Sequence, residues 1–103
     1  MKNKDTQETT WKPYNPATHG KLSTADKNAL PISAFAFPHT RKEPMIDASH
    51  VRNAMSRFDQ VKDVTDLERD LAFSNIQKAA KHFDIDIKET DWHQFGSQRA
   101  HSE

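Results

Sequence analysis

The sequence predicts a mainly α fold, a small module built on two long antiparallel helices at about 48–61 and 66–83. Three observations support this prediction. Apolar residues recur with a helical period in both segments, each segment follows a residue that can cap a helix, and only a short turn separates them. A short N-terminal helix, a packed extended loop over 31–46 and flexible tails complete the expected fold.

Composition limits both the fold and the function. The chain has 103 residues and a hydrophobic content of 34%, which allows one domain with a small core. It has no cysteine, so neither disulfides nor a thiolate zinc site can stabilise that core. Fifteen basic residues balance fifteen acidic ones, which argues against tight, non-specific nucleic-acid binding. No segment approaches the roughly 20 apolar residues of a membrane span, so we expect a cytoplasmic protein without membrane contact.

The only two glycines, Gly20 and Gly96, stand where the composition changes along the chain. We therefore expect three parts: a flexible N-terminal arm over 1–20, a single helical module over 21–95 and a disordered C-terminal tail over 96–103. The arm carries Trp11 and Tyr14 next to prolines. The sequence leaves open whether these aromatic side chains bind a partner or fold back onto the module.

The module is predicted to begin with a short helix over about 24–29. Ser23 and Asp26 have the spacing of a capping box. Pro31 restricts Leu30 to an extended backbone, and this ends the helix.

The segment 31–46 is predicted to be an extended loop, because prolines at positions 31, 38 and 44 interrupt it. It carries too many large apolar side chains for a solvated linker. We therefore expect it to lie across the helices and to bury Phe35, Phe37 or both.

The first long helix is expected to begin after Asp47. The Asp47 carboxylate can accept hydrogen bonds from the amides of the first turn, and Ile46 and Val51 have the spacing of a hydrophobic staple. One apolar stripe predicts a helix over about 48–61, and its members are Val51, Ala54, Met55, Phe58 and Val61.

The second long helix follows a tight turn at 62–64. Thr65 and Glu68 form a capping box, the most specific local pattern in the chain. The apolar face over about 66–83 consists of Ala72, Phe73, Ile76, Ala79, Ala80 and Phe83. Because the turn is short, the two helices are predicted to pack antiparallel. Downstream, one helical turn is expected to dock Trp92 and Phe95 on the core.

A polar stripe lies beside the buried face of the first long helix. Its members His50, Asn53 and Arg57 have the spacing of one helix face. Such a stripe can contact base edges or the acidic groups of a partner. The alternative is a solvated helix face, with Asn53 or Arg57 holding carbonyl groups of the extended loop.

Arg41 and Lys42, on the extended loop, form the only adjacent basic pair. Together with Arg57 they are a candidate anion-binding spot near the amino end of the first long helix. The alternative is that the pair only contributes to solubility.

The chain has no pattern typical of catalysis or of metal binding. None of the six histidines has the spacing that places two metal ligands on one helix face. His50 is better explained by a contact with Asp47 that completes the helix cap. No nucleophile has a base at suitable spacing, and no glycine-rich loop can hold a phosphate. We therefore expect no enzymatic activity, no catalytic residues, no cofactor and no metal.

Two runs of the sequence resemble a small bacterial and phage domain family of unknown function. The runs are Leu30-Pro31-x-Ser33-Ala34-Phe35-Ala36 and, after Arg41-Lys42, Pro44-x-Ile46-Asp47-Ala48-x-His50-x-Arg52-Asn53-Ala54. The resemblance covers about 21–92 and implies no activity. Asp63 and Asp84 stand where relatives often have glycine, just beyond the end of each long helix. Both are therefore expected to adopt a left-handed backbone.

The function predicted from these observations is a non-enzymatic protein–protein interaction module. Its expected contact surface is the extended loop with the polar stripe, and the candidate binding residues are Arg41, Lys42, His50, Asn53 and Arg57. The alternative is nucleic-acid binding by a helix-turn-helix-like arrangement of the two long helices, which the zero net charge disfavours. The sequence leaves the partner and the oligomeric state open.

Overall fold

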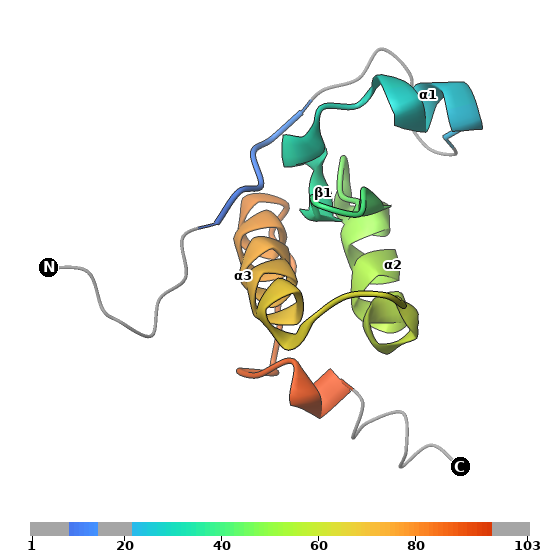
Figure 1. Ribbon diagram of the computed structural model, residues 1–103. Coiled ribbons are helices and arrows are strands. Elements are labelled where there is room, and N and C mark those ends of the chain that lie inside the picture. Colours follow the sequence, from blue (N-terminus) through green and yellow to red (C-terminus); the bar gives the residue numbers. More distant parts are fainter. Residues whose placement is uncertain (1–8, 15–21, 96–103) are drawn as a thin grey trace, which may run out of the picture.

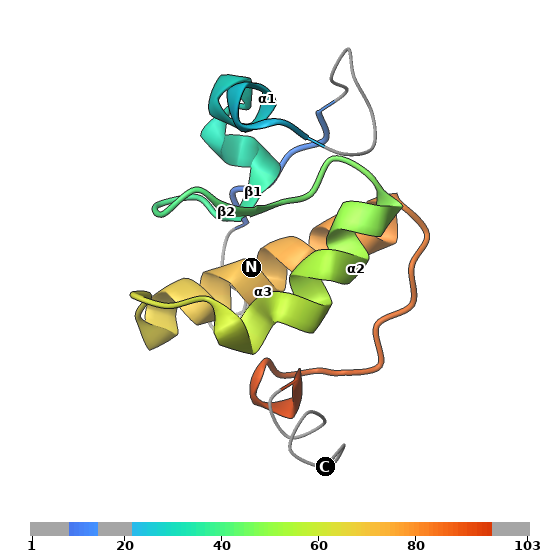
Figure 2. The same cartoon turned by 90° about the vertical axis from the view of Figure 1, so that its right-hand side faces the viewer.

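The computed structural model describes residues 9–14 and 22–95 of the chain. The elements in order are α1 (Thr24–Ala29), the 3-10 turn η1 (Ile32–Ala34), β1 (Phe35–Phe37), β2 (Lys42–Pro44), α2 (Ala48–Arg57), the 3-10 turn η2 (Phe58–Gln60) and α3 (Asp66–His82). Helices α2 and α3 lie side by side (Figure 1). The two strands lie over this pair, and α1 lies beyond the strands (Figure 2).

Side-chain caps begin all three α-helices at the predicted residues. The Ser23 hydroxyl accepts the amide of Asp26 at 3.1 Å, and the Asp26 carboxylate accepts the amide of Ser23 at 3.2 Å. The reciprocal bonds between Thr65 and Glu68 measure 3.1 Å and 2.7 Å. The amide of Thr65 therefore lowers the pKa of Glu68. Asp47 caps α2. Local chemistry is thus sufficient to predict where each helix begins.

The prediction of a mainly α module is wrong, because the segment expected to be a loop contains a sheet. Strands β1 and β2 pair antiparallel, with Phe35 opposite Pro44 and Phe37 opposite Lys42. Both phenylalanines are buried. The prolines do not prevent this pairing, since Pro38 lies in the turn and Pro44 ends a strand at the edge of the sheet, where a missing N–H is tolerated.

The prediction of two long antiparallel helices is wrong as well. Of the described elements, only α2 and α3 have seven or more residues, and α2 ends at Arg57 instead of Val61. The turn η2 follows and places Phe58 in the core. Arg69 of α3 donates to the carbonyls of Phe58 at 3.1 Å and of Val61 at 2.9 Å. These bonds stabilise the early end of α2, because they satisfy carbonyl groups beyond it.

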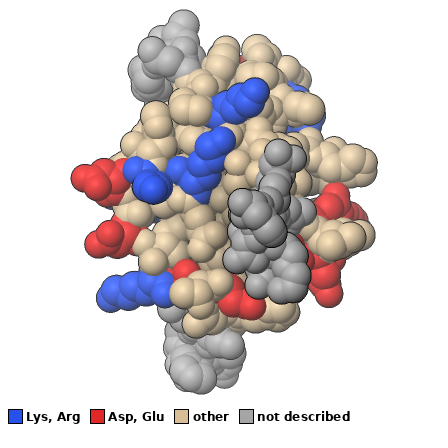
Figure 3. Space-filling view, turned by 90° about the vertical axis from the view of Figure 1, so that its left-hand side faces the viewer, with Lys and Arg blue, Asp and Glu red and all other residues tan. Residues whose placement is uncertain are grey.

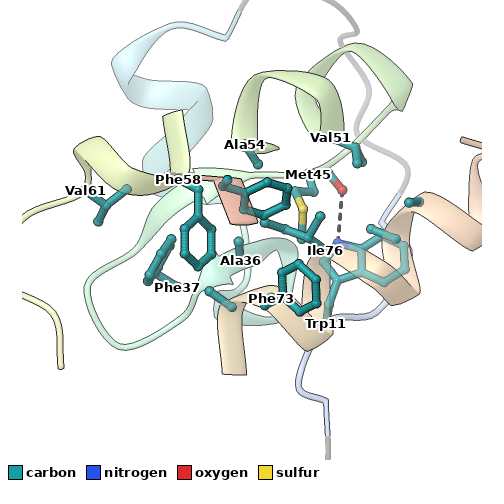
Figure 4. Packing of buried hydrophobic residues seen from close by; sticks show 14 residues of the cluster. Trp11, Ala36, Phe37, Met45, Val51, Ala54, Phe58, Val61, Phe73 and Ile76 are labelled. Atoms are coloured by element: carbon teal, nitrogen blue, oxygen red, sulfur yellow. Dashed lines mark hydrogen bonds between the residues drawn. The ribbon is translucent and has the colours of Figure 1, made fainter. Parts of the chain in front are cut away.

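The main core lies between the hairpin and the two longer helices, and Figure 4 shows its aromatic centre. The rings of Phe37 and Phe58 lie 5.5 Å apart, and those of Phe58 and Phe95 lie 5.2 Å apart. Phe73 of α3 packs on Phe95 at 5.3 Å. Docking of Phe95 on the core is therefore confirmed. A second, smaller cluster joins α1 to the hairpin and consists of Leu30, Ala34, Phe35 and Ile46.

Trp11, far from the other core residues in the sequence, is completely buried. Its indole Nε1 donates to the carbonyl of Met45 at 3.0 Å (Figure 4). The amide of Lys12 donates to the carbonyl of Ser33 at 3.0 Å. Of the two possibilities that the sequence leaves open for Trp11, the structure shows that it folds back onto the module. The rest of the predicted flexible arm, 1–8 and 15–20, lies outside the described residues.

The buried side chain of Asn75 in α3 binds this segment. Its Oδ1 atom accepts the amides of Thr10 at 2.8 Å and of Trp11 at 3.0 Å. Its Nδ2 atom donates to the Thr10 hydroxyl at 3.0 Å and to the carbonyl of Ala36 at 2.9 Å. All the hydrogen bonds that an amide side chain can make are thus formed. Asn75 joins α3, β1 and the N-terminal segment.

The two aspartates beyond the longer helices have the expected left-handed backbone. Asp63 has φ 64° and Asp84 has φ 63°. Beyond α3, the indole of Trp92 donates to the carboxylate of Asp70 at 2.7 Å. The predicted disordered tail at 96–103 lies outside the described residues. None of the described helices is long and apolar enough to cross a membrane.

Candidate functional site

A hollow of about 480 Å³ opens between α1, β2 and α2, which Figure 2 shows one above the other. The residues that line it are Leu22, Lys27, Glu43, Pro44, Ser49, His50, Asn53 and Arg57. Three separate elements therefore contribute to its wall, and most of the side chains are polar or charged.

A second hollow of about 550 Å³ adjoins the first and shares Glu43 and Arg57 with it. Its other lining residues are Thr40, Lys42, Gln60, Val61, Lys62 and Asp63. We call the two hollows together the α2 groove. Arg57 and Glu43 lie at its middle.

The structure brings four of the five predicted binding residues to the α2 groove. His50, Asn53 and Arg57 line the first hollow, as expected for side chains on one face of α2. Lys42 lines the second hollow. The hairpin places Lys42 there, because β2 packs beside α2.

Arg41 is placed elsewhere and has a structural role. Its Nη2 atom donates to the carbonyls of Lys27, Asn28 and Leu30 at 2.9, 3.3 and 3.0 Å. Its guanidinium carbon also lies 4.7 Å from the centre of the Phe35 ring. These carbonyls lie at the C-terminal end of α1, where a helix has few N–H groups of its own left to donate to them. Arg41 therefore attaches α1 to the hairpin.

His50 is held in place by the cap of α2. Both its amide and its Nδ1 atom lie 2.8 Å from Asp47 Oδ1, which confirms the predicted contact. Its side chain is largely buried. The ring is thus oriented by Asp47, and Nε2 is the nitrogen that remains for a ligand in the groove.

Glu43 places a carboxylate among the cations of the groove. Burial raises the pKa of Glu43, while Arg57, Lys27, Lys42 and His50 act in the opposite direction without cancelling that effect. The residue also has φ 60°, a left-handed backbone that is costly for a non-glycine residue. Strained backbone of this kind is more frequent at functional positions than elsewhere.

The basic side chains of the α2 groove are available to a ligand. In the part of the chain that the structure describes, the side chains of Lys27, Lys42 and Arg57 form no hydrogen bond and no ion pair. The four basic residues of the lining, which include Lys62, exceed the two acidic ones, Glu43 and Asp63, by two. The groove is therefore suited to negatively charged groups.

Sequence reasoning missed several charged residues of the groove, among them Lys27 and Glu43. Lys27 lies in the short first helix, and Glu43 lies in a segment expected to be a loop. Only the packing of α1 and β2 against α2 places them beside Arg57. No local pattern in the sequence could have indicated this.

The described residues include no group of three or more His, Cys, Asp or Glu side chains placed to hold a metal ion. The short contacts of histidine with carboxylates are pairs, His50 with Asp47, His93 with Asp91 and His39 with Glu68. Such pairs orient a ring or cap a turn.

The fold and the groove define a small α+β domain with a polar, basic groove between a hairpin and a helix. The model of the family of unknown function DUF6582 matches residues 24–90, more than half of the chain, and the chain belongs to this family. Searches of curated proteins and of solved structures found no match.

Proposed function

We propose that this chain is a non-enzymatic protein-binding module and that the α2 groove is its contact surface. The observation that carries the proposal is the convergence of Lys27, Lys42 and Arg57 from three elements on one groove. All three side chains are exposed, so an anionic partner can reach them without displacing an internal partner.

We further propose that the protein is of bacterial or phage origin, that it is cytoplasmic and that it has no catalytic activity. The origin is inferred from the sequence runs around Pro31 and Asp47. The absence of catalysis is supported by the lining of the groove, which combines cations and two carboxylates without a paired nucleophile and base.

The alternative of a helix-turn-helix-like nucleic-acid binder receives less support from the fold. A recognition helix presents its first residues to the bases. The corresponding first turn of α3 carries Asp66 and Glu68, which repel phosphates. On the face that Figure 3 shows, a few basic side chains lie next to one another in the upper part, and acidic side chains lie at both sides of the view and below them.

Affinity capture with matched variants tests the proposal. The double variant Asn53→Ala/Arg57→Ala removes two exposed side chains of the groove. The control, Gln77→Ala/Lys78→Ala, removes two exposed side chains of α3. Each protein is immobilised, exposed to lysate of the source cells and washed, after a thermal melt has shown that it is folded.

The expected result is that wild type and control retain the same partner protein and that the groove variant loses it. Recovery of the same proteins by all three would refute the α2 groove as the contact surface. Recovery of nucleic acid in place of protein, sensitive to the groove variant, would favour the alternative.

A further inference from the structure

Arg57 occupies the position in the α2 groove from which both hollows can be reached. It lines each of them, with Lys27 on one side and Lys42 on the other. Like charges that are held close together repel one another, and an anionic ligand relieves that repulsion. The arrangement favours a ligand with more than one negative group, spaced along the groove.

We propose that the α2 groove binds an acidic, extended segment of a partner protein, whose Asp or Glu carboxylates pair with Arg57, Lys27 and Lys42. This inference rests on the proposed function, because it names the chemistry of the partner at the same groove. A guanidinium can hold a carboxylate through two parallel hydrogen bonds, and a lysine supplies a flexible point charge. The side chain of Asn53 offers both a donor and an acceptor to the main chain of such a segment.

The first hollow also offers apolar contact. Leu22 and Pro44 belong to its lining, beside the charged residues. Single small anions make no use of such contacts, whereas a peptide places its aliphatic groups against them. Together, the apolar contacts and the length of the groove favour a peptide segment over a small ion.

Glu43 makes the binding dependent on pH. A ligand carboxylate near Glu43 favours the protonated form of Glu43, which burial already favours. Binding should therefore take up a proton and become tighter as the pH falls. Arg57, Lys27, Lys42 and His50 face Glu43, and Asp47 holds His50. A variant of Glu43 isolates the contribution of this carboxylate from that of its neighbours.

Fluorescence anisotropy with short labelled peptides tests the inference on the full chain. The probe is hexaglutamate at low ionic strength, compared with hexaglutamine, hexalysine and a single-stranded oligonucleotide. We expect hexaglutamate alone to bind measurably. Arg57→Ala should weaken it about tenfold, as expected for the loss of one charge-assisted pair. Lys78→Ala, outside the groove, should leave the affinity unchanged.

The variant Glu43→Gln should bind hexaglutamate more tightly than wild type at neutral pH and should lose most of the dependence on pH. Equal weakening by Arg57→Ala and Lys78→Ala would overturn the inference, because it would indicate non-specific attraction. Equal binding of hexaglutamine, or tighter binding of the oligonucleotide, would also overturn it.

The outcome for this inference can be separated from that for the proposed function. If the captured partner depends on Asn53 and Arg57 but hexaglutamate does not bind, the groove is a protein-binding surface for a segment of other chemistry. If neither partner nor peptide depends on these residues, both proposals fail.

Discussion

The buried amide of Asn75 accepts the main-chain N–H of Trp11 at 3.0 Å, although 64 positions separate the two residues in the sequence. The same side chain binds the carbonyl of Ala36 in β1. One amide group therefore connects the N-terminal segment, the sheet and α3. The core thus includes Trp11, which lies outside the residues 24–90 that the family model matches.

Asn75→Ala should destabilise the domain by about 3 kcal/mol or more. It leaves the buried amide of Trp11 and the buried carbonyl of Ala36 without partners, and each such group costs about 1–3 kcal/mol. It also removes the acceptor of the partly buried amide of Thr10. Urea unfolding followed by tryptophan fluorescence measures the change. Gln77→Ala, an exposed position on the same helix, is the control and should shift stability by less than about 0.5 kcal/mol.

Trp11→Phe should cost about 1–3 kcal/mol, because it keeps an aromatic ring but removes the donor to the Met45 carbonyl. Thermal unfolding of the variant and of wild type gives this difference. An unchanged melting temperature would show that the N-terminal segment does not contribute to the folded core.

Arg41→Ala should detach α1 from the hairpin, while the amides of α3 stay protected from hydrogen exchange. The guanidinium donates hydrogen bonds to three carbonyls at the end of α1, and no other described side chain donates to them. Hydrogen exchange should rise at 24–29 and stay slow at 72–80. Arg41→Lys should rescue only part of the loss, since an ammonium cannot reproduce the planar fork. Equal exchange throughout the chain would contradict the local role of Arg41.

Asp63→Gly should stabilise the domain by about 1 kcal/mol, because glycine adopts φ 64° without the steric cost that a side chain brings. Asp63→Ala is the matched comparison and should not stabilise. Chemical unfolding of the two variants distinguishes this effect from the loss of the Asp63 charge, which both share.

Glu43→Gln should raise stability at neutral pH. Burial raises the folded-state pKa of Glu43 above the ordinary value of 4.5, so the ionised form costs stability. That cost is absent below the ordinary value, grows as the pH rises through the interval up to the folded-state pKa and stays constant above it. The stability difference between variant and wild type, followed from acid to neutral pH, should therefore increase. A constant difference would contradict the burial of the carboxylate.

Local patterns in the sequence were sufficient for the helix starts. The caps at Ser23, Asp47 and Thr65 depend only on neighbouring residues, and all are confirmed. Capping bonds act within a few residues, which is why they are readable in one sequence. The left-handed backbone at Asp63 and Asp84, expected from the resemblance to relatives with glycine there, is confirmed as well.

The fold class was predicted wrongly for two different reasons. The pairing of Phe35 with Pro44 is local in the sequence, but the prolines of this segment were taken to exclude strands, although they lie where no donor is needed. The carbonyls just beyond the early end of α2 bind Arg69, which lies in another helix, and no local pattern indicates this contact.

The candidate site was predictable only where its residues lie on one helix. His50, Asn53 and Arg57 share a helix face, so their spacing was enough to bring them together. Arg41 is an arginine like Arg57 and lies next to Lys42. Its guanidinium, however, donates to carbonyls at the end of α1 and does not line the groove. Its role could be known only after α1 was placed in space.

Photo-crosslinking from within the α2 groove tests the central claim most directly. A benzoylphenylalanine at position 53 lies in the first hollow, and the same group at position 77 lies on α3, outside the groove. We expect position 53 to crosslink to an acidic segment of one partner protein and position 77 to give no such product. Crosslinking of that partner from position 77 but not from position 53 would contradict the assignment of the groove as the binding surface.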